Sequence, residues 1–68
     1  MPVITYAGAE LPDEKKEELI KKLTETASEV TGTPSQFMTV LIQEYADNSL
    51  GMGGETVTEI KARLAEKS

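Results

Sequence analysis

The chain has 68 residues, 7 basic and 12 acidic side chains and a net charge of −5, with no cysteine, histidine or tryptophan. The missing residue types exclude thiolate zinc sites, thiol catalysis and a histidine general base, and the negative charge argues against nucleic acids and anionic membrane surfaces as partners. No apolar run approaches the roughly 18 residues of a membrane span and no signal peptide opens the chain, so we expect one soluble, cytoplasmic domain over residues 1–68.

The first two predicted elements are a strand and a helix. Residues 3–9 begin with β-branched and aromatic side chains, which favours a strand. Residues 13–31 repeat apolar side chains at the spacing of one helix face. The members of this stripe are Leu19, Ile20, Leu23, Ala27 and Val30. Gly32 can adopt the left-handed conformation that ends a helix, and Pro34 prevents its continuation, so the helix is about 27 Å long.

Residues 37–45 predict a second strand that carries apolar side chains on both faces. One face holds Met38, Val40 and Ile42, and the other holds Phe37, Thr39, Leu41 and Gln43. The order strand–helix–strand predicts a right-handed βαβ unit with parallel strands. One helix covers one face of a two-stranded sheet, and so small a domain offsets its ordering entropy poorly, so we expect the second face to meet further copies of the chain.

The C-terminal third predicts a tight hairpin and a short helix. Residues 47–54 are rich in glycine and other turn formers, which favours a hairpin or a bulge. The helix is indicated by Val57, Ile60, Ala62 and Leu64. Thr56 or Thr58 is the expected cap.

Few residues of the chain offer catalytic or metal-binding chemistry. The helix glutamates are expected on a solvated face with lysine partners four residues away. Glu44 with Asp47 lacks a third ligand, so we predict no metal site. Residues 51–54 lack the Lys-Ser/Thr that follows a phosphate-binding glycine loop.

Pro2 is the one chemically unusual position. A small second residue permits removal of Met1, which leaves proline with a free secondary amine. Burial in an apolar pocket lowers the pKa of an amine, and a neutral amine near pH 7 is a competent general base. If Met1 is retained, the Pro2 nitrogen is a tertiary amide without a basic lone pair. A proline at position 2 is also common in proteins where it has no function. Judged on this residue alone, the absence of a function is favoured over a catalytic amine.

Six motifs along the chain change that balance. They are Met1-Pro2-Val3-Ile4, the helix start at residues 12–20, Leu23-Thr24-Glu25, Thr31-Gly32-Thr33-Pro34, the strand at residues 40–44 and Leu50-Gly51-Met52-Gly53-Gly54-Glu55. In order and length, the chain resembles the 4-oxalocrotonate tautomerase family from residue 2 to about residue 55, and the residues beyond match less clearly.

The resemblance implies an α/β (α+β) fold: a βαβ subunit with parallel strands, a Gly-rich hairpin and a short C-terminal helix, with the sheet completed by dimerisation. Dimers of the family usually assemble further into hexamers, although smaller dimers occur. The resemblance also implies a keto–enol tautomerase or isomerase that needs no cofactor. In it the Pro2 amine moves a proton between the oxygen and a carbon of an enol or dienol 2-oxo acid, a small-molecule substrate.

The chain departs from the family at three helper positions. Leu11 stands where the family has a loop arginine, Thr39 where it has a strand arginine, and Leu50 where it has an aromatic side chain. By the resemblance, the catalytic residue is Pro2 and the substrate-binding residues are Leu11, Phe37, Thr39, Leu50 and Met52.

Without the two arginines, which bind substrate carboxylates and the developing enolate, we expect weak activity on dicarboxylates, or a monocarboxylate or less polar natural substrate. Lys61 or Arg63 of a neighbouring subunit are candidates for a replacement cation. The alternative interpretation is a non-catalytic oligomeric scaffold or small-molecule binder. Dehalogenation or decarboxylation through the same proline is a third, less favoured reading.

Overall fold

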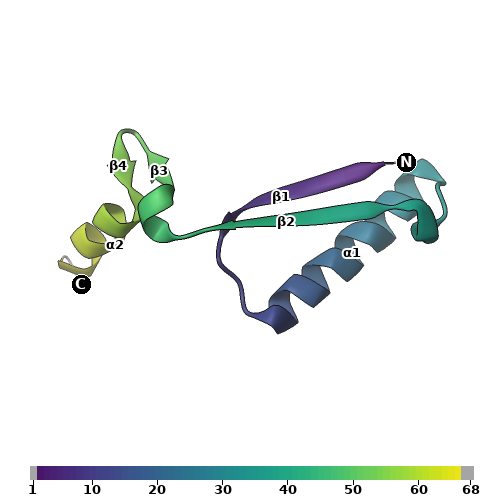
Figure 1. Cartoon of the computed structure of the whole chain (residues 1–68), viewed down its shortest axis with the longest axis horizontal. Helices are drawn as coiled ribbons and strands as arrows, with labels where there is room; N and C mark the ends of the chain where they lie inside the picture. Colours follow the sequence, from purple (N-terminus) through teal and green to yellow (C-terminus); the bar gives the residue numbers. More distant parts are fainter. Residues whose placement is uncertain (1, 67–68) are drawn as a thin grey trace.

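The computed structural model describes residues 2–66, and Figure 1 shows its elements in chain order. They are β1 (Val3–Ala9), α1 (Asp13–Thr31), the 3-10 turn η1 (Ser35–Phe37), β2 (Thr39–Tyr45), the 3-10 turn η2 (Asp47–Ser49), β3 (Gly51–Met52), β4 (Glu55–Thr56) and α2 (Val57–Glu66). The first predicted strand and the predicted helix coincide with β1 and α1. None of the helices within residues 2–66 is long and apolar enough to cross a membrane.

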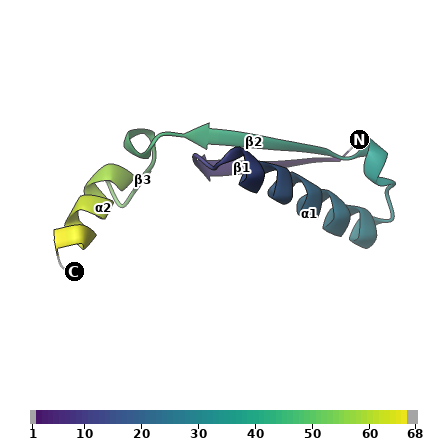
Figure 2. The ribbon, with the colours of Figure 1, turned by 90° about the horizontal axis from the view of Figure 1, so that it is seen from below.

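Strands β1 and β2 pair in parallel from Val3 opposite Thr39 to Ala9 opposite Tyr45. Helix α1 lies against one face of this pair, as the view in Figure 2 shows. Strands β3 and β4 form a separate antiparallel hairpin whose turn residues, Gly53 and Gly54, have positive φ angles of 62° and 89°. The predicted βαβ unit with parallel strands, a Gly-rich hairpin and a C-terminal helix is therefore confirmed.

The two faces of the sheet differ in their covering. Towards α1 point the half-buried side chains of Ile4, Tyr6, Val40, Ile42 and Glu44. On the opposite, open face lie the exposed side chains of Val3, Thr5, Ala7, Leu41, Gln43 and Tyr45. Val3 is 58 % and Leu41 46 % exposed, and nothing within residues 2–66 covers them. The open face is thus apolar at several positions.

The chain by itself has no closed core. No residue of the described range is fully buried. The accessible surface is 5212 Å², whereas a folded monomer of 7.4 kDa exposes about 4,200 Å². The radius of gyration is 15.9 Å, whereas about 11 Å is usual for this length. Figure 1 shows the cause, because the hairpin and α2 extend away from the βαβ unit.

Two details of the predicted elements are wrong. Phe37 and Met38 precede β2 instead of opening it, because η1 turns the chain there: the Phe37 amide donates to the Pro34 carbonyl at 3.0 Å and the Met38 amide to the Ser35 carbonyl at 3.0 Å. Val30 is 80 % and Ile20 40 % exposed, so the apolar stripe of α1 is narrower than predicted and ends before Val30. The predicted helix end is confirmed, since Gly32 has φ 76° and its amide donates to the Ser28 carbonyl.

Candidate functional site

Pro2 lies directly before β1, where its backbone is held by β2. The Thr39 amide donates a hydrogen bond to the Pro2 carbonyl at 3.1 Å, which extends the ladder of the two strands by one residue. Pro2 is exposed and Thr39 half-buried. Phe37, in η1, precedes Thr39 by two residues and is 48 % exposed. Three of the predicted site residues therefore gather at the amino-terminal end of the sheet.

The other three predicted residues lie beyond the carboxyl-terminal end of the two-stranded sheet. Leu11 follows β1, and Leu50 and Met52 follow β2, so the length of the sheet, roughly 20 Å for seven residues, separates them from Pro2. Figure 1 shows the N-terminus at the start of β1 and the β3–β4 hairpin on the far side of the sheet from it. One chain alone does not bring Leu11, Leu50 and Met52 to Pro2.

Leu11 and Leu50 each line an open hollow at that far end. Leu11 borders a hollow of about 350 Å³ together with Tyr6 and Leu19. Leu50 borders one of about 450 Å³ along the hairpin. Met52 is 68 % exposed. In a single chain, these three side chains therefore do not enclose a pocket.

Glu44 ties the far end of the sheet together. Its Oε2 accepts the Leu11 amide hydrogen at 2.8 Å, and its Oε1 pairs with the Lys16 Nζ at 2.9 Å. The Leu11 amide, and then Lys16, lower the pKa of the Glu44 carboxyl below its ordinary value of 4.5. Glu44, followed by Asp13, raises the pKa of Lys16 above 10.5.

Sequence reasoning considered Glu44 only as a partner of Asp47 in a metal site. The signal that was missed is the alternation of side chains along β2: Glu44 lies on the same face as Val40 and Ile42, the face that α1 covers. Asp47 instead pairs with Lys61 at 2.8 Å, and residues 2–66 hold no group of three or more candidate metal ligands.

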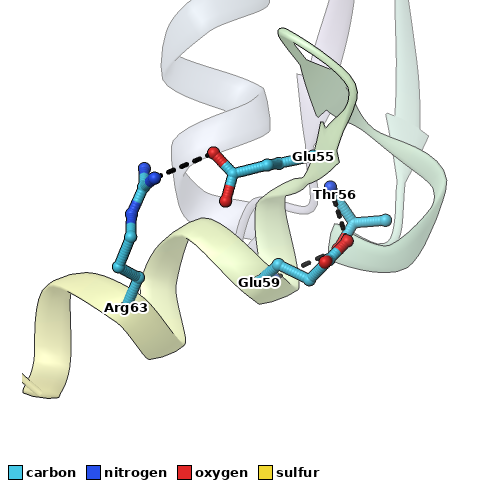
Figure 3. A network of polar contacts seen from close by, with 4 residues as sticks. All are labelled: Glu55, Thr56, Glu59 and Arg63. Atoms are coloured by element: carbon cyan, nitrogen blue, oxygen red, sulfur yellow. Dashed lines mark hydrogen bonds and ion pairs between the residues drawn. The ribbon is translucent and has the colours of Figure 1, made fainter.

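A polar network joins the hairpin to α2 (Figure 3). Thr56 is the helix cap: its Oγ1 accepts the Glu59 amide hydrogen at 3.1 Å, while its own amide donates to the Glu59 carboxylate at 3.1 Å. The amide and hydroxyl of Thr56 lower the pKa of Glu59. Arg63 pairs with Glu55 at 2.9 Å. Both cations suggested by the sequence, Lys61 and Arg63, are thus paired within their own chain.

The parallel βαβ unit with a proline at the start of its first strand defines a class of small α/β subunits, and comparisons with known proteins specify it. The family model described as "Tautomerase enzyme" matches residues 2–60. A probable tautomerase from Bacillus cereus is 33 % identical over 60 residues, which cover 87 % of this chain and 98 % of that relative.

Solved structures agree with this match. The apo form of an unfused 4-oxalocrotonate tautomerase is 35 % identical with a TM-score of 0.83, over 87 % of this chain and 98 % of that one. TomN, a 4-oxalocrotonate tautomerase homologue of the tomaymycin biosynthetic pathway, is 29 % identical with a TM-score of 0.87, over 90 % and 95 % of the two chains. The chain belongs to the tautomerase family, and the resemblance seen in the sequence is confirmed.

Proposed function

We propose that this protein is a cofactor-independent keto–enol tautomerase in which the Pro2 amine, freed by removal of Met1, is the general base. Family membership supports an isomerase. The observation that carries the proposal is the hydrogen bond from the Thr39 amide to the Pro2 carbonyl, because it anchors the proline backbone while the residue itself stays exposed. A fixed, accessible amine is what a positioned general base requires.

The reaction proposed is a proton relay on an enol or dienol 2-oxo acid. The Pro2 nitrogen accepts the proton of the enol hydroxyl, and the electron pair of that O–H bond forms the second bond of the carbonyl. The π electrons of the enol C=C bond take the proton back from the ammonium and become the new C–H bond, so no net proton is gained or lost. Thr39 lies next to Pro2 in the sheet, and its hydroxyl supplies one neutral hydrogen bond to the substrate. Phe37 supplies an apolar wall.

The substrate class proposed is a monocarboxylate or a less polar 2-oxo acid. Leu11, Thr39 and Leu50 are all uncharged and would line its pocket with Phe37 and Met52. Lys61 and Arg63, the candidates for a replacement cation, form ion pairs with Asp47 and Glu55. A dicarboxylate would therefore bury its second carboxylate without a cationic partner, which is costly.

A complete pocket requires more than one copy of the chain, and the proposal includes a homo-oligomer. Strand β1 pairs with β2 on one side only within the described residues, and it carries none of the charges or prolines that usually protect an edge strand. Pairing of two β1 edges would extend the sheet. Association of such dimers through their open sheet faces would then remove the excess exposed surface. A hexamer is therefore proposed ahead of a dimer.

The test is ketonisation of phenylenolpyruvate, followed by ultraviolet absorbance. Protein whose mass shows Met1 removal is compared with Pro2→Ala and with protein that retains Met1, in which the Pro2 nitrogen is an amide that bears the methionine. The processed form should be faster than both by about 10²- to 10⁴-fold, the usual contribution of a general base. Equal rates in all three would instead establish the non-catalytic scaffold or binder.

A further inference from the structure

Glu44 joins three parts of the fold that lie far apart in the sequence. It stands on β2, one residue before the strand ends, and its two oxygens have different partners. One accepts the Leu11 amide at 2.8 Å from the loop after β1, and the other pairs with Lys16 at 2.9 Å from the first turns of α1. The side chains of Lys16 and Glu44 are only 29 % and 26 % exposed.

The loop that Glu44 holds is short. It runs from the last ladder pair, Ala9 with Tyr45, to Pro12, whose carbonyl already accepts the Lys15 and Lys16 amides at 3.0 and 3.1 Å. Leu11 therefore sits between two fixed points, and its amide is fixed by the Glu44 carboxylate as well. Asp13 also pairs with Lys16: its carboxylate lies 3.4 Å from the Lys16 Nζ, and its side chain is 94 % exposed.

We propose that Glu44 is a positioning residue for substrate binding: by holding the Leu11 amide, it sets where the Leu11 side chain stands as a wall of the pocket. This rests on the proposed function, in which Leu11 lines the substrate next to the Pro2 of another copy. Glu44 does not touch the substrate in this scheme. It acts through the loop, and Lys16 keeps its carboxylate oriented.

The test compares E44Q with E18Q, and adds E44A. Glu18 is the control for loss of a lysine pair: it has a lysine partner, Lys22 at 3.1 Å, and it borders the same hollow as Leu11, but the Leu11 amide donates to Glu44 and not to Glu18. Two quantities are measured: hydrogen exchange at the Leu11 amide, and kcat and KM for phenylenolpyruvate in the processed protein.

We expect faster Leu11 exchange and a raised KM with nearly unchanged kcat in E44Q, and a larger effect, about 10- to 100-fold in KM, in E44A. E18Q should match the wild type in both. A loss of folded protein would lower the apparent kcat and leave KM unchanged. A rise in KM at constant kcat therefore distinguishes positioning from destabilisation. If E44A does not fold, the comparison of E44Q with E18Q decides.

Equal KM values in E44Q and E18Q would overturn the assignment while the proposed function stands. Unchanged Leu11 exchange in E44Q would overturn it as well. A processed wild type without Pro2-dependent turnover would overturn the proposed function itself and the assignment of Glu44 with it, which is a different and recognisable result.

Discussion

The amide of Thr39 and the carbonyl of Pro2 lie 3.1 Å apart, so the residue proposed as the base is part of the same ladder as the residue proposed to replace an arginine. A side chain introduced at position 39 therefore starts beside the amine. This relationship makes the substrate preference of the site accessible to a single substitution.

Thr39→Arg should raise kcat/KM for the dicarboxylate 2-hydroxymuconate by about 100-fold. The reason is that a guanidinium binds a carboxylate in bidentate fashion and stabilises charge on the developing enolate. Initial rates with 2-hydroxymuconate and phenylenolpyruvate provide the measurement. Thr26→Arg, on the exposed outer side of α1, is the control and should change neither rate. Equal effects at both positions would contradict a role for residue 39 in the site.

Leu41→Lys should break the assembly of the protein. Leu41 is 46 % exposed on the open sheet face, and a lysine buried there between copies would lose its water without gaining a partner. Light scattering after size exclusion reports the molar mass. Val30→Lys is the matched control, because Val30 is also apolar and is 80 % exposed at the end of α1. A native mass for both variants would show that the open face is not the interface.

The Glu44–Lys16 pair should stabilise the fold in a window of pH that can be worked out from its shifts. The Glu44 pKa is lowered from 4.5, so its contribution is present above that value and is lost as the pH falls through the folded-state pKa. The Lys16 pKa is raised from 10.5, so its contribution is present below that value and is lost as the pH rises through the folded-state pKa.

Denaturant unfolding of the wild type and E44Q over a range of pH measures this window. The difference in the free energy of unfolding should be flat near neutral pH and should shrink in strong acid. A difference that persists unchanged at the lowest pH would mean that the charge of Glu44 is not what stabilises the pair.

Thr56→Val should destabilise α2 by about 1 kcal/mol, because it removes the hydroxyl that caps the helix. The effect is read from the exchange of the α2 amides. Thr58→Val, two residues further along the chain and exposed, is the control and should leave exchange unchanged. If the two variants behave alike, the cap is not needed for the helix.

Local signals explain why much of the fold could be predicted from the sequence. Gly32 and Pro34 determine the end of α1, and the β-branched and aromatic side chains at the start of residues 3–9 favour β1. Near residue 37 the same apolar pattern fits a strand or a turn, and only the hydrogen bonds of η1 decide between them. The predicted end of the stripe at Val30 was wrong because periodicity does not show where the sheet stops.

The candidate site was predictable to a smaller extent. Parallel pairing of the two strands follows from their order, and it is what places Thr39 next to Pro2. The link between Glu44 and Leu11 depends on strand register and on contacts 33 residues apart, which spacing does not reveal. The roles of Leu11, Leu50 and Met52 stay predictions, because the chain by itself holds them at the end opposite Pro2.

The absence of any fully buried residue within positions 2–66 has a consequence for how the protein responds to dilution. If the core closes only between copies, folding and association are one equilibrium, and mass action governs both. Each tenfold dilution then removes about 1.4 kcal/mol from every association step. The melting temperature should fall as the protein is diluted, and the amine at Pro2 would be a catalyst only above a threshold concentration of the chain.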